Sequence, residues 1–465
     1  MPERERLAII GGGPAGYVGA VRAAQLGAEV TLIEKKEVGG TCLNEGCIPT
    51  KTLTSTAHLY RLIKKSGNIG IEAGYPALNW EQVMRRKEQV VRRLVNGVKY
   101  LLKERKVALI QGTASFLDEK TLLINKKDGG IEKLQADKIL ISTGSVPVAL
   151  PVMGADLDGV VDSFQALSFE QVPSTLLIVG GGYIGCEFAS IYHSFGAEVT
   201  IVEMLTQILP GEDEEIISTL RRKMEKEGIK IYTESKVSGI FHQEGEIKKV
   251  KVLTPKGELE ILSEKVLTCV GRKPYTDTLN LKSMGITQDD GKIKVDEHMR
   301  TNLQHIYSAG DCLGGYLLAH VASMEAECAV ENMLGVNLKM DYTAVPRCIF
   351  TYPEIGGVGL TEKESLEKGF KIKIGRFPFT ANGRALAEDE TEGMVKIIAE
   401  DKSDKLLGAI ILGNRATDLI AELTLGIGMG IKLKELIETI HAHPTLAEAI
   451  RESALKTAGR PLHIL

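Results

Sequence analysis

Two glycine-rich segments of this chain repeat one another. Residues 11–16 read GGGPAG and residues 180–185 read GGGYIG, and each follows a short apolar stretch. The likeness continues downstream, because GAEVT at 27–31 recurs as GAEVT at 196–200. Each segment therefore predicts a strand, a glycine turn, a helix and a second strand, which is the pattern of dinucleotide-binding α/β folds.

An acidic residue ends the second predicted strand of each unit, Glu34 in the first and Glu203 in the second. In such folds the glycines permit a tight turn and a close approach to the pyrophosphate, and the acid hydrogen-bonds a ribose. A single glycine pattern also occurs for packing alone, but its repetition with strand, helix and acid predicts two dinucleotide sites. Residues 204–206 are Met, Leu and Thr, with no base to meet a 2′-phosphate, so the second site is predicted to prefer NAD over NADP.

Length and charge limit the remaining classes of protein. A chain of 465 residues predicts several domains, because a domain of this kind takes roughly 100 to 150 residues. A net charge of -4 argues against a nucleic-acid-binding surface. The polar N-terminus lacks the apolar core of a secretory signal, and no apolar run approaches the ~20 residues of a membrane helix. The sequence therefore predicts a cytoplasmic protein, with a mature mitochondrial-matrix chain as the alternative.

Two of the seven cysteines, Cys42 and Cys47, lie close together directly after the first acidic strand. An odd number of cysteines in a long chain does not indicate a secreted disulfide framework, so a disulfide here is expected to be catalytic. Gly46 allows the chain to turn, and a helix predicted to about Lys65 places the thiols near a positive helix end, which lowers a thiol pKa. The alternatives are buried structural cysteines or metal ligands. The spacing is unlike a usual ligand pair and no second Cys/His cluster is near, so no metal is predicted.

The rest of the chain divides by its hydrophobic pattern. Residues 80–106 are charged with interspersed apolar residues and predict a long amphipathic helix with a solvated basic face. Residues 107–145 predict short strands, and residues 146–151 predict a linker into the second unit. The hydrophobic pattern changes again near residues 269–274. From residue 342 the pattern alternates between strand and helix and ends in two short helices.

The cysteine segment and several later motifs resemble one family. The run GGTCLNEGCIPTK at 39–51 resembles the active-site signature of the pyridine nucleotide-disulfide oxidoreductases, in particular of the branch that oxidises dihydrolipoamide. The likeness covers almost the whole chain, through ISTGS at 141–145, VGRKP at 270–274, SAGD at 308–311, LLAH at 317–320 and HAHPTLAE at 441–448.

The resemblance implies an α/β fold with two Rossmann-like dinucleotide-binding domains. An FAD-binding domain with the redox disulfide is expected at residues 1–147 and an NAD-binding domain at 148–269. A central domain at 270–341 completes the FAD site, and a C-terminal α+β dimerisation domain occupies 342–465.

The family match also implies the cofactor contacts, residue by residue. For FAD these are the glycine loop, the ribose acid, the start of the cysteine segment, adenine-side strand positions and residues beside the ribityl chain and pyrimidine edge: Gly11, Gly13, Pro14, Ala15, Gly16, Glu34, Lys35, Gly40, Thr41, Cys42, Lys51, Gly112, Ala114, Thr143, Gly144, Asp311, Leu318, Ala319 and His320. For NAD they are Gly180, Gly182, Tyr183, Ile184, Gly185, Glu187, Glu203, Val237 and Gly271. Structural alternatives stay open: Asp311 as a turn acid, Gly112 and Thr143 as strand-end turns, and Tyr183 as a packing aromatic.

The resemblance divides the catalytic roles. It implies that Cys42 faces the dithiol substrate and that Cys47 faces the flavin. Lys51 is expected beside the flavin, paired with Glu187, because a buried lysine needs an acidic partner. The alternative is that both are ordinary surface charges.

Near the C-terminus the resemblance selects His443 as the base that takes a proton from the incoming thiol and Glu448 as its orienting partner. Sequence alone explains Glu448 equally well as part of a helix capping box that Thr445 begins. The family's His-Pro bond is cis, which implies a cis bond before Pro444, and His441 is expected to be a structural neighbour. In the family this histidine comes from the second subunit, so a homodimer is expected.

The implied reaction oxidises protein-bound dihydrolipoamide to lipoamide and reduces NAD to NADH. The expected partners are lipoyl domains of the acyltransferase subunits of 2-oxo acid dehydrogenase complexes, or the carrier protein of the glycine cleavage system. No nucleic-acid or membrane partner is expected. Two alternatives stay open: another disulfide reductase of the family, and a redox-inactive flavoprotein that acts as a docking subunit.

Overall fold

The computed structural model describes residues 4–465 and divides into two compact units. Unit 1 contains residues up to 52, 81–148 and 270–341, and unit 2 contains 53–80, 149–269 and 342–465. The chain therefore passes between the units several times, and helix α3 (Cys47–Lys65) crosses the boundary. The division into four domains stays a prediction.

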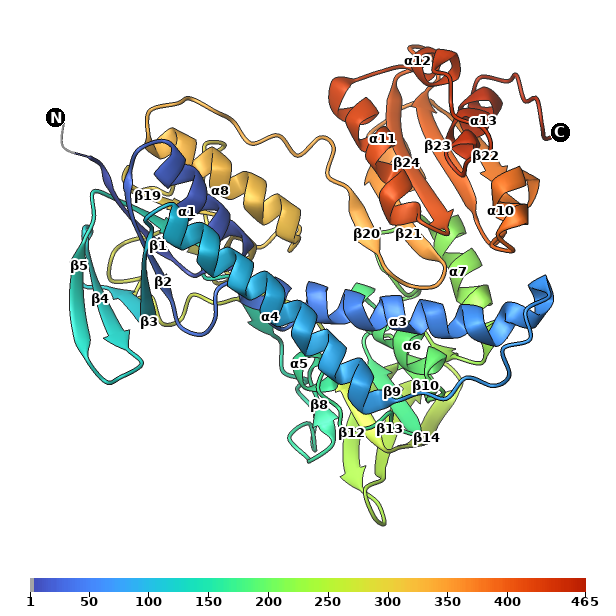
Figure 1. Cartoon of the computed structure of the whole chain (residues 1–465), viewed down its shortest axis with the longest axis horizontal. Helices are drawn as coiled ribbons and strands as arrows, with labels where there is room; N and C mark the ends of the chain where they lie inside the picture. The colour runs from blue at the N-terminus through green and yellow to red at the C-terminus, as the bar shows by residue number, and fades with distance from the viewer. Residues whose placement is uncertain (1–3) are drawn as a thin grey trace. The chain divides into compact units, whose positions relative to one another are not determined.

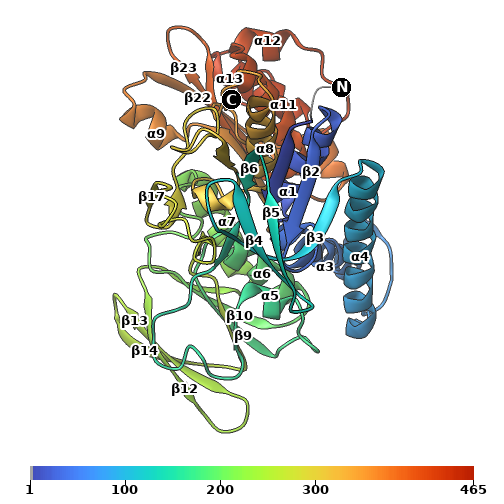
Figure 2. The same ribbon diagram turned by 90° about the vertical axis from the view of Figure 1, so that its left-hand side faces the viewer.

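A seven-stranded sheet forms the centre of unit 1, in the order β19-β6-β1-β2-β3-β4-β5. Figure 2 labels β2 to β6 of this sheet. The strands from β19 to β3 are parallel, and β3, β4 and β5 are antiparallel. Their bounds are β1 (Arg6–Ile10), β2 (Glu29–Glu34), β3 (Ala108–Phe116), β4 (Thr121–Lys126), β5 (Ile131–Gln135), β6 (Lys138–Ile141) and β19 (Ile306–Ser308). The strands predicted around the first glycine loop and in residues 107–145 are confirmed.

Three long helices supply most of the helical residues in the apolar core of unit 1. Helices α1 (Pro14–Gln25) and α8 (Ala319–Met333) lie side by side (Figure 1) and bury small residues of both helices in one core cluster. The predicted long helix is confirmed as α4 (Trp80–Glu104), which buries Val95, Val98 and Leu102 in the same cluster and exposes its arginines. Beyond them lie α2 (Gly40–Asn44), η2 (Asp311–Leu313) and the short pair β17 (Gln288–Asp289) and β18 (Lys292–Ile293).

The predicted linker at 146–151 is wrong in its first part. Strand β7 (Ser145–Pro147) pairs antiparallel with β16 (Arg272–Pro274). The partner strand lies more than a hundred residues away in the sequence, so no local pattern marks this pairing.

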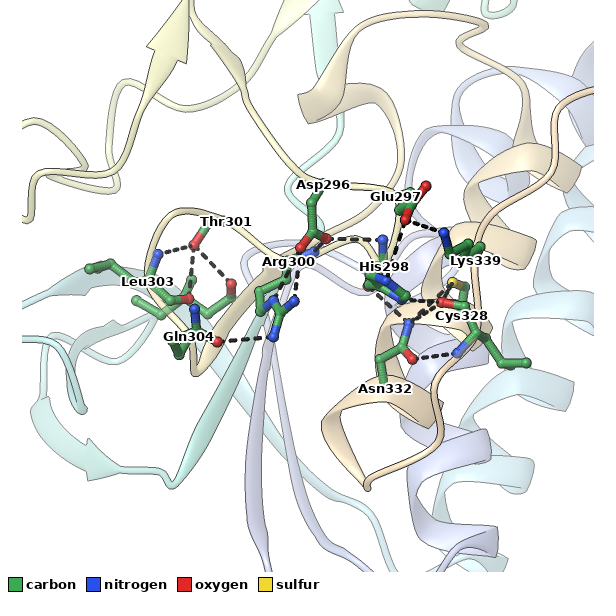
Figure 3. Close-up of polar contacts among 12 residues, drawn as sticks. Asp296, Glu297, His298, Arg300, Thr301, Leu303, Gln304, Cys328, Asn332 and Lys339 are labelled. Atoms are coloured by element: carbon green, nitrogen blue, oxygen red, sulfur yellow. Dashed lines mark hydrogen bonds and ion pairs between the residues drawn. The ribbon is translucent and has the colours of Figure 1, made fainter.

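The segment after α8 is held in place by Asn332. Its side-chain amide donates to the Leu338 carbonyl at 2.9 Å and accepts from the Leu338 N–H at 2.8 Å (Figure 3). The same amide donates to the His298 carbonyl at 3.1 Å, and Lys339 pairs with Glu297 at 2.5 Å. These contacts fix the path of the chain in unit 1 before it enters unit 2 at Tyr342.

Unit 2 contains a second parallel sheet, in the order β11-β10-β9-β15-β8. The order β3-β2-β1-β6 in unit 1 corresponds to β11-β10-β9-β15 both in space and along the chain, so the repeat read from two strands extends to four. The fifth strands differ, because β8 precedes β9 in the chain whereas β19 follows β6. The elements are β8 (Val160–Val161), α5 (Ser163–Ala166), β9 (Thr175–Val179), α6 (Tyr183–Ser194), β10 (Glu198–Val202), α7 (Glu214–Glu227), β11 (Lys230–Tyr232) and β15 (Lys265–Thr268). A three-stranded antiparallel sheet of β12 (Lys236–His242), β13 (Lys248–Thr254) and β14 (Gly257–Ser263) completes this part.

The C-terminal part of unit 2 is a five-stranded antiparallel sheet in the order β20-β21-β24-β23-β22, covered by helices. Its elements are β20 (Arg347–Ile349), β21 (Glu354–Gly359), α9 (Glu362–Glu367), β22 (Ile372–Pro378), η3 (Phe379–Ala381), α10 (Gly383–Ala387), β23 (Met394–Glu400), β24 (Leu406–Gly413), α11 (Ala416–Met429), α12 (Leu433–Glu438) and α13 (Glu448–Thr457). The predicted mixture of strand and helix with two short terminal helices is confirmed. The peptide bonds before Pro353 and Pro444 are cis, as the resemblance implied for the second. Within residues 4–465, no helix is both long and apolar enough to cross a membrane.

A buried lysine joins the C-terminal sheet to helix α7 within unit 2. The Lys396 side chain is 1% exposed, and its Nζ lies 2.8 Å from Asp213, 3.0 Å from Glu215 and 2.7 Å from Glu362. Asp213 also caps α7 by accepting from the Ile216 N–H. One ammonium thus contacts a fully buried carboxylate and two half-buried ones, and Arg376 adds a second positive charge beside Glu215 and Glu362.

We expect Lys396→Met to destabilise unit 2 by about 3 to 5 kcal/mol, because it leaves Asp213 buried without its counter-charge. The midpoint of thermal unfolding measures this loss. Lys373→Met is the matched control, since Lys373 pairs with Asp404 at 2.6 Å on the surface. The control is expected to change stability by less than about 1 kcal/mol. Equal shifts for the two variants would contradict the interpretation.

Candidate active site

The glycine loop of unit 1 has the geometry that a pyrophosphate requires. Gly11 has a φ of +101°, and a Cβ there would lie 2.3 Å from the Ser142 carbonyl oxygen. A Cβ on Gly16 would lie 1.7 Å from the Gly11 oxygen, so only glycine permits this contact of helix and turn. Helix α1 begins after Gly13, and none of the described side chains caps it. Its first N–H groups therefore suit a phosphate of FAD.

The acidic residue that ends the second strand of each unit hydrogen-bonds the glycine loop of its own unit. Glu34 accepts from the Gly12 N–H at 2.6 Å and from the Lys36 N–H at 2.7 Å. Glu203 repeats this arrangement with the N–H groups of Gly181 at 2.6 Å and Leu205 at 2.7 Å. These hydrogen bonds of the acids to their own loops were not predicted from the sequence. The signal was that both acids stand at the same position relative to their glycine segments. Their contact with a ribose stays a prediction.

The glycine loop of unit 2 is open where a second pyrophosphate is expected. Gly180 has a φ of +107°, and a Cβ on Gly185 would lie 2.0 Å from the Gly180 oxygen. A Cβ on Gly182 would meet nothing within 4 Å, and Tyr183 at the start of α6 is 39% exposed. Two other predicted NAD residues lie on different elements of unit 2: Ile184 is in α6, and Val237 is buried in β12.

One predicted NAD residue is not placed with the others. Gly271 lies in unit 1, whereas the remaining predicted NAD residues lie in unit 2. Its φ of +117° and the hydrogen bond from the Val148 N–H to its carbonyl explain it as a turn glycine. Its role at NAD stays a prediction.

A polar network in unit 1 surrounds the residue expected at the ribityl chain. Asp311 accepts from the Ser145 hydroxyl at 2.6 Å, and Arg272 donates to the Ser145 hydroxyl and carbonyl, each at 2.8 Å. The Thr143 hydroxyl is buried, and none of the described groups hydrogen-bonds to it, so it can bind a cofactor. Ser145 and Arg272 were not predicted, although both stand within motifs that carry the resemblance.

The other predicted FAD residues of unit 1 occupy helix starts and strand positions. Leu318 is the residue before α8, so Ala319 and His320 provide helix-start N–H groups as expected. A Cβ on Gly112 would lie 2.7 Å from the Asn125 carbonyl oxygen, so the sheet itself requires this glycine. Lys35 lies over the Tyr275 ring at 3.4 Å from the ring centre.

The two cysteines lie on consecutive helices of unit 1. Cys42 is in α2, and Cys47 is the first residue of α3. All seven cysteines are among the described residues, and none forms a disulfide. The hydrogen bond with Cys47 and burial raise the pKa of the Cys42 thiol, while the charge of Lys51 opposes this rise. The predicted lowering of a thiol pKa therefore does not apply to Cys42, and it stays a prediction for Cys47, which begins α3.

The predicted pair of Lys51 and Glu187 is divided between the units. Lys51 lies one turn after Cys47 on α3 in unit 1, and Glu187 lies on α6 in unit 2. Glu187 is buried and accepts from the Phe350 N–H at 3.0 Å. An exposed surface role is thus wrong for Glu187, and its pairing with Lys51 stays a prediction.

His443 and Glu448 form a hydrogen-bonded pair. His443 Nδ1 lies 2.8 Å from Glu448 Oε1, and the His443 side chain is 79% exposed. Glu448 Oε2 accepts from the Thr445 N–H at 2.9 Å, but the Thr445 hydroxyl donates to the Ala442 carbonyl. Only half of the capping box is therefore formed, and Glu448 both orients the imidazole and supports the chain before α13.

The charge of Glu448 is stabilised by the same contacts. Burial alone raises the pKa of Glu448, but the hydrogen bonds from the Thr445 backbone and His443 hold it below its usual value. An ionised carboxylate accepts from Nδ1, which leaves Nε2 of His443 to exchange a proton. His441 is instead buried and bonds Glu422 at 2.9 Å and the Thr439 carbonyl at 3.0 Å, which confirms it as a structural neighbour.

The chain belongs to the pyridine nucleotide-disulphide oxidoreductase family. Residues 5–326 match the family model, and residues 345–454 match the model of its dimerisation domain, which supports a homodimer. A dihydrolipoyl dehydrogenase of Bacillus subtilis is 42% identical over 460 residues, covering 98% of this chain and 99% of that protein. One of Halobacterium salinarum is 41% identical over 462 residues, covering 99% and 97%.

Solved structures share the whole fold. LpdA from Mycobacterium tuberculosis has a TM-score of 0.90 at 26% identity, and the match covers 97% of this chain and 99% of that chain. The HOCl-induced flavoprotein disulfide reductase RclA from Escherichia coli has a TM-score of 0.86 at 30% identity, with the same coverage. The predicted family and fold class are confirmed.

Proposed function

We propose that this chain oxidises dihydrolipoamide to lipoamide and delivers the electrons to NAD through a Cys42–Cys47 disulfide and FAD. The observation that carries the proposal is the hydrogen-bonded pair of cysteines in the unit that holds the FAD-type glycine loop. Relatives named dihydrolipoyl dehydrogenase match nearly the full length of both chains, which bears out the predicted activity.

The protein's side chains supply the thiol chemistry. Nε2 of His443 takes the proton of one substrate thiol, and the resulting thiolate attacks the Cys42 sulfur of the disulfide. The S–S bond breaks, and Cys47 leaves as a thiolate. The second substrate thiol then displaces Cys42 from the mixed disulfide, which releases cyclic lipoamide and leaves two reduced cysteines. FAD held at the α1 loop of unit 1 would supply the two-electron acceptor for the reduced cysteines and the hydride donor for NAD.

The N-terminal ends of α1 and α6 are the proposed phosphate sites for FAD and NAD. Thr143, with its unused hydroxyl, and Asp311 are the proposed polar contacts of FAD in unit 1. Lys51 is proposed to lie beside the flavin, in contact with Glu187. These assignments combine the observed loop geometry with the family match.

We expect NAD to be used at least about 100-fold more efficiently than NADP, because the carboxylate of Glu203 repels a 2′-phosphate and no base follows it. Glu203→Ser combined with Met204→Arg is expected to narrow this preference by at least about tenfold, since arginine binds phosphate. Steady-state kinetics with both cofactors measures the ratio, and Met204→Leu is the control. A preference unchanged by the double variant would exclude Glu203 as the selecting residue.

The proposed partners are a second copy of the chain and a lipoyl-bearing protein. The second copy supplies His443 to each Cys42–Cys47 pair. The lipoyl bearer is an acyltransferase subunit of a 2-oxo acid dehydrogenase complex or the carrier of the glycine cleavage system. We place the enzyme in the cytoplasm, since the named relatives come from bacteria and archaea.

A direct assay tests the proposed function. Purified FAD-loaded protein is mixed with dihydrolipoamide and NAD, and NADH formation is followed by absorbance. The likeness to RclA favours one second candidate, a reductase of another disulfide. Reduction of the cysteine pair by NADH without dihydrolipoamide oxidation would favour that candidate. No colour change with either reductant would favour a redox-inactive docking subunit.

A further inference from the structure

A buried arginine on helix α3 contacts the helix that follows the second glycine loop. The Arg61 side chain is 10% exposed. Its Nε donates to the Ser194 hydroxyl at 2.6 Å, and its Nη2 donates to the Ser190 carbonyl at 3.5 Å, both on α6. Its Nη1 pairs with Glu227 at the end of α7, at 2.7 Å. All these residues belong to unit 2, so one guanidinium joins three helices of that unit.

An aromatic ring covers the other side of this guanidinium. The Arg61 Cζ lies 4.6 Å from the centre of the Tyr352 ring, and the His58 ring centre lies 5.8 Å from it. The Tyr352 hydroxyl donates to Glu390, at 2.9 and 3.0 Å from its two carboxylate oxygens. Hydrogen bonds to Ser194, Ser190 and Glu227, together with the cation–π contact with Tyr352, therefore hold the guanidinium in place.

The neighbouring histidine does not compete for Glu227. Burial, followed by the positive charge of Arg61, lowers the pKa of His193 on α6. With His193 neutral, Glu227 pairs with Arg61 at 2.7 Å and with Lys223 at 3.7 Å. Arg61 is the closer of these two cations and the one that also bonds α6.

Helix α3 can transmit this restraint along its axis. Cys47 is the first residue of α3, and Cys47, Lys51, His58 and Arg61 lie on one face because they are three, four or seven residues apart. At 1.5 Å per residue, Arg61 lies roughly 21 Å from Cys47 along the axis. From Thr50 to Lys65 the sequence contains no glycine or proline, the residues at which helices usually bend.

We propose that Arg61, covered by Tyr352, is a positioning residue for the redox cysteine: it locks the C-terminal half of α3 against α6 and so fixes the helix end that carries Cys47. Arg61 touches no substrate and acts only through the placement of α3. This inference rests on the proposed function.

Arg61→Met tests the proposal, because methionine fills part of the same space without donors or charge. We expect dithiol-dependent NADH formation to fall by roughly 10- to 100-fold, since small displacements of a reacting group have effects of this size. The long-wavelength charge-transfer band formed on adding dithiothreitol is expected to weaken or shift. Turnover of NADH with an artificial electron acceptor, which bypasses the cysteines, is expected to stay within about twofold, together with the flavin content. The control is Arg222→Met, an exposed arginine that bonds only to Thr219 among the described contacts.

Several outcomes would overturn the proposal. One is unchanged dithiol turnover with an unchanged charge-transfer band. Another is an equal fall of both activities with loss of flavin, which would make Arg61 a folding residue only. If Arg61→Met does not fold, Tyr352→Leu and Ser194→Ala carry the same test, and Arg61→Lys is expected to restore part of the dithiol activity by keeping the pair with Glu227. Wild-type protein without dihydrolipoamide activity would defeat the proposed function instead, while the dithiothreitol band would still report on Arg61.

Discussion

Cys47→Ser lowers dithiol-dependent NADH formation by at least about 1000-fold while FAD stays bound, because a serine oxygen can neither complete the disulfide nor leave as a thiolate. The remaining Cys42 is a thiol and cannot react with the reduced dithiol, because joining two thiols in a disulfide requires an oxidant. NADH turnover with an artificial acceptor is expected to persist, since the cofactor sites at α1 and α6 are untouched. Stopped-flow reduction with dihydrolipoamide should show no charge-transfer band.

Cys328→Ser is the matched control for that variant. Cys328 is another thiol of unit 1, but it is buried and contacts Asn332 and the Leu338 carbonyl in the segment after α8. Its replacement is expected to keep dithiol turnover within about twofold, as for substitutions away from the chemistry. Wild-type turnover in Cys47→Ser would refute the disulfide mechanism.

His443→Gln is expected to lower dithiol turnover by about 10² to 10⁴, the usual contribution of a general base. Glutamine is close in size and can still donate to Glu448, but it cannot accept the thiol proton. Because His443 is largely exposed, flavin content and thermal stability are expected to remain unchanged. His463→Gln is the control, since His463 is also exposed and also bonds a carboxylate, that of Glu452. Loss of FAD in His443→Gln would identify a structural histidine instead.

Mixed dimers of the two inactive variants test which copy supplies the histidine. In a dimer of one Cys47→Ser chain and one His443→Gln chain, one site regains an intact cysteine pair and an intact histidine if the histidine comes from the partner copy. Random mixing then restores about a quarter of the wild-type activity, since half of the dimers are mixed and each has one working site. If each chain supplied its own histidine, no activity would return.

The residues near the glycine loops show how far the sequence could predict the site. Both loops, both acids and the helix that begins at the second cysteine were read from local patterns, since each depends on residues a few positions apart. The Ser145–Arg272 contact next to Asp311 could not be found this way, because its members come together only when β7 pairs with β16. The raised pKa of Cys42 could not be predicted for a related reason: a helix end was visible in the sequence, but the hydrogen bond between the thiols was not.

By itself, the sequence determined that the chain holds two dinucleotide-binding units, that a cysteine pair follows the first, and that a histidine and a glutamate lie near the C-terminus. These features follow from short repeats, helical periodicity and motif spacing, which act over one or two turns of chain. Only the tertiary structure decided that the repeat extends to four parallel strands, that Glu34 and Glu203 bind their own loops, and that Arg61 joins α3 to α6. Such contacts depend on segments far apart in sequence, whose partners are chosen by packing and by the requirement that buried polar groups be satisfied.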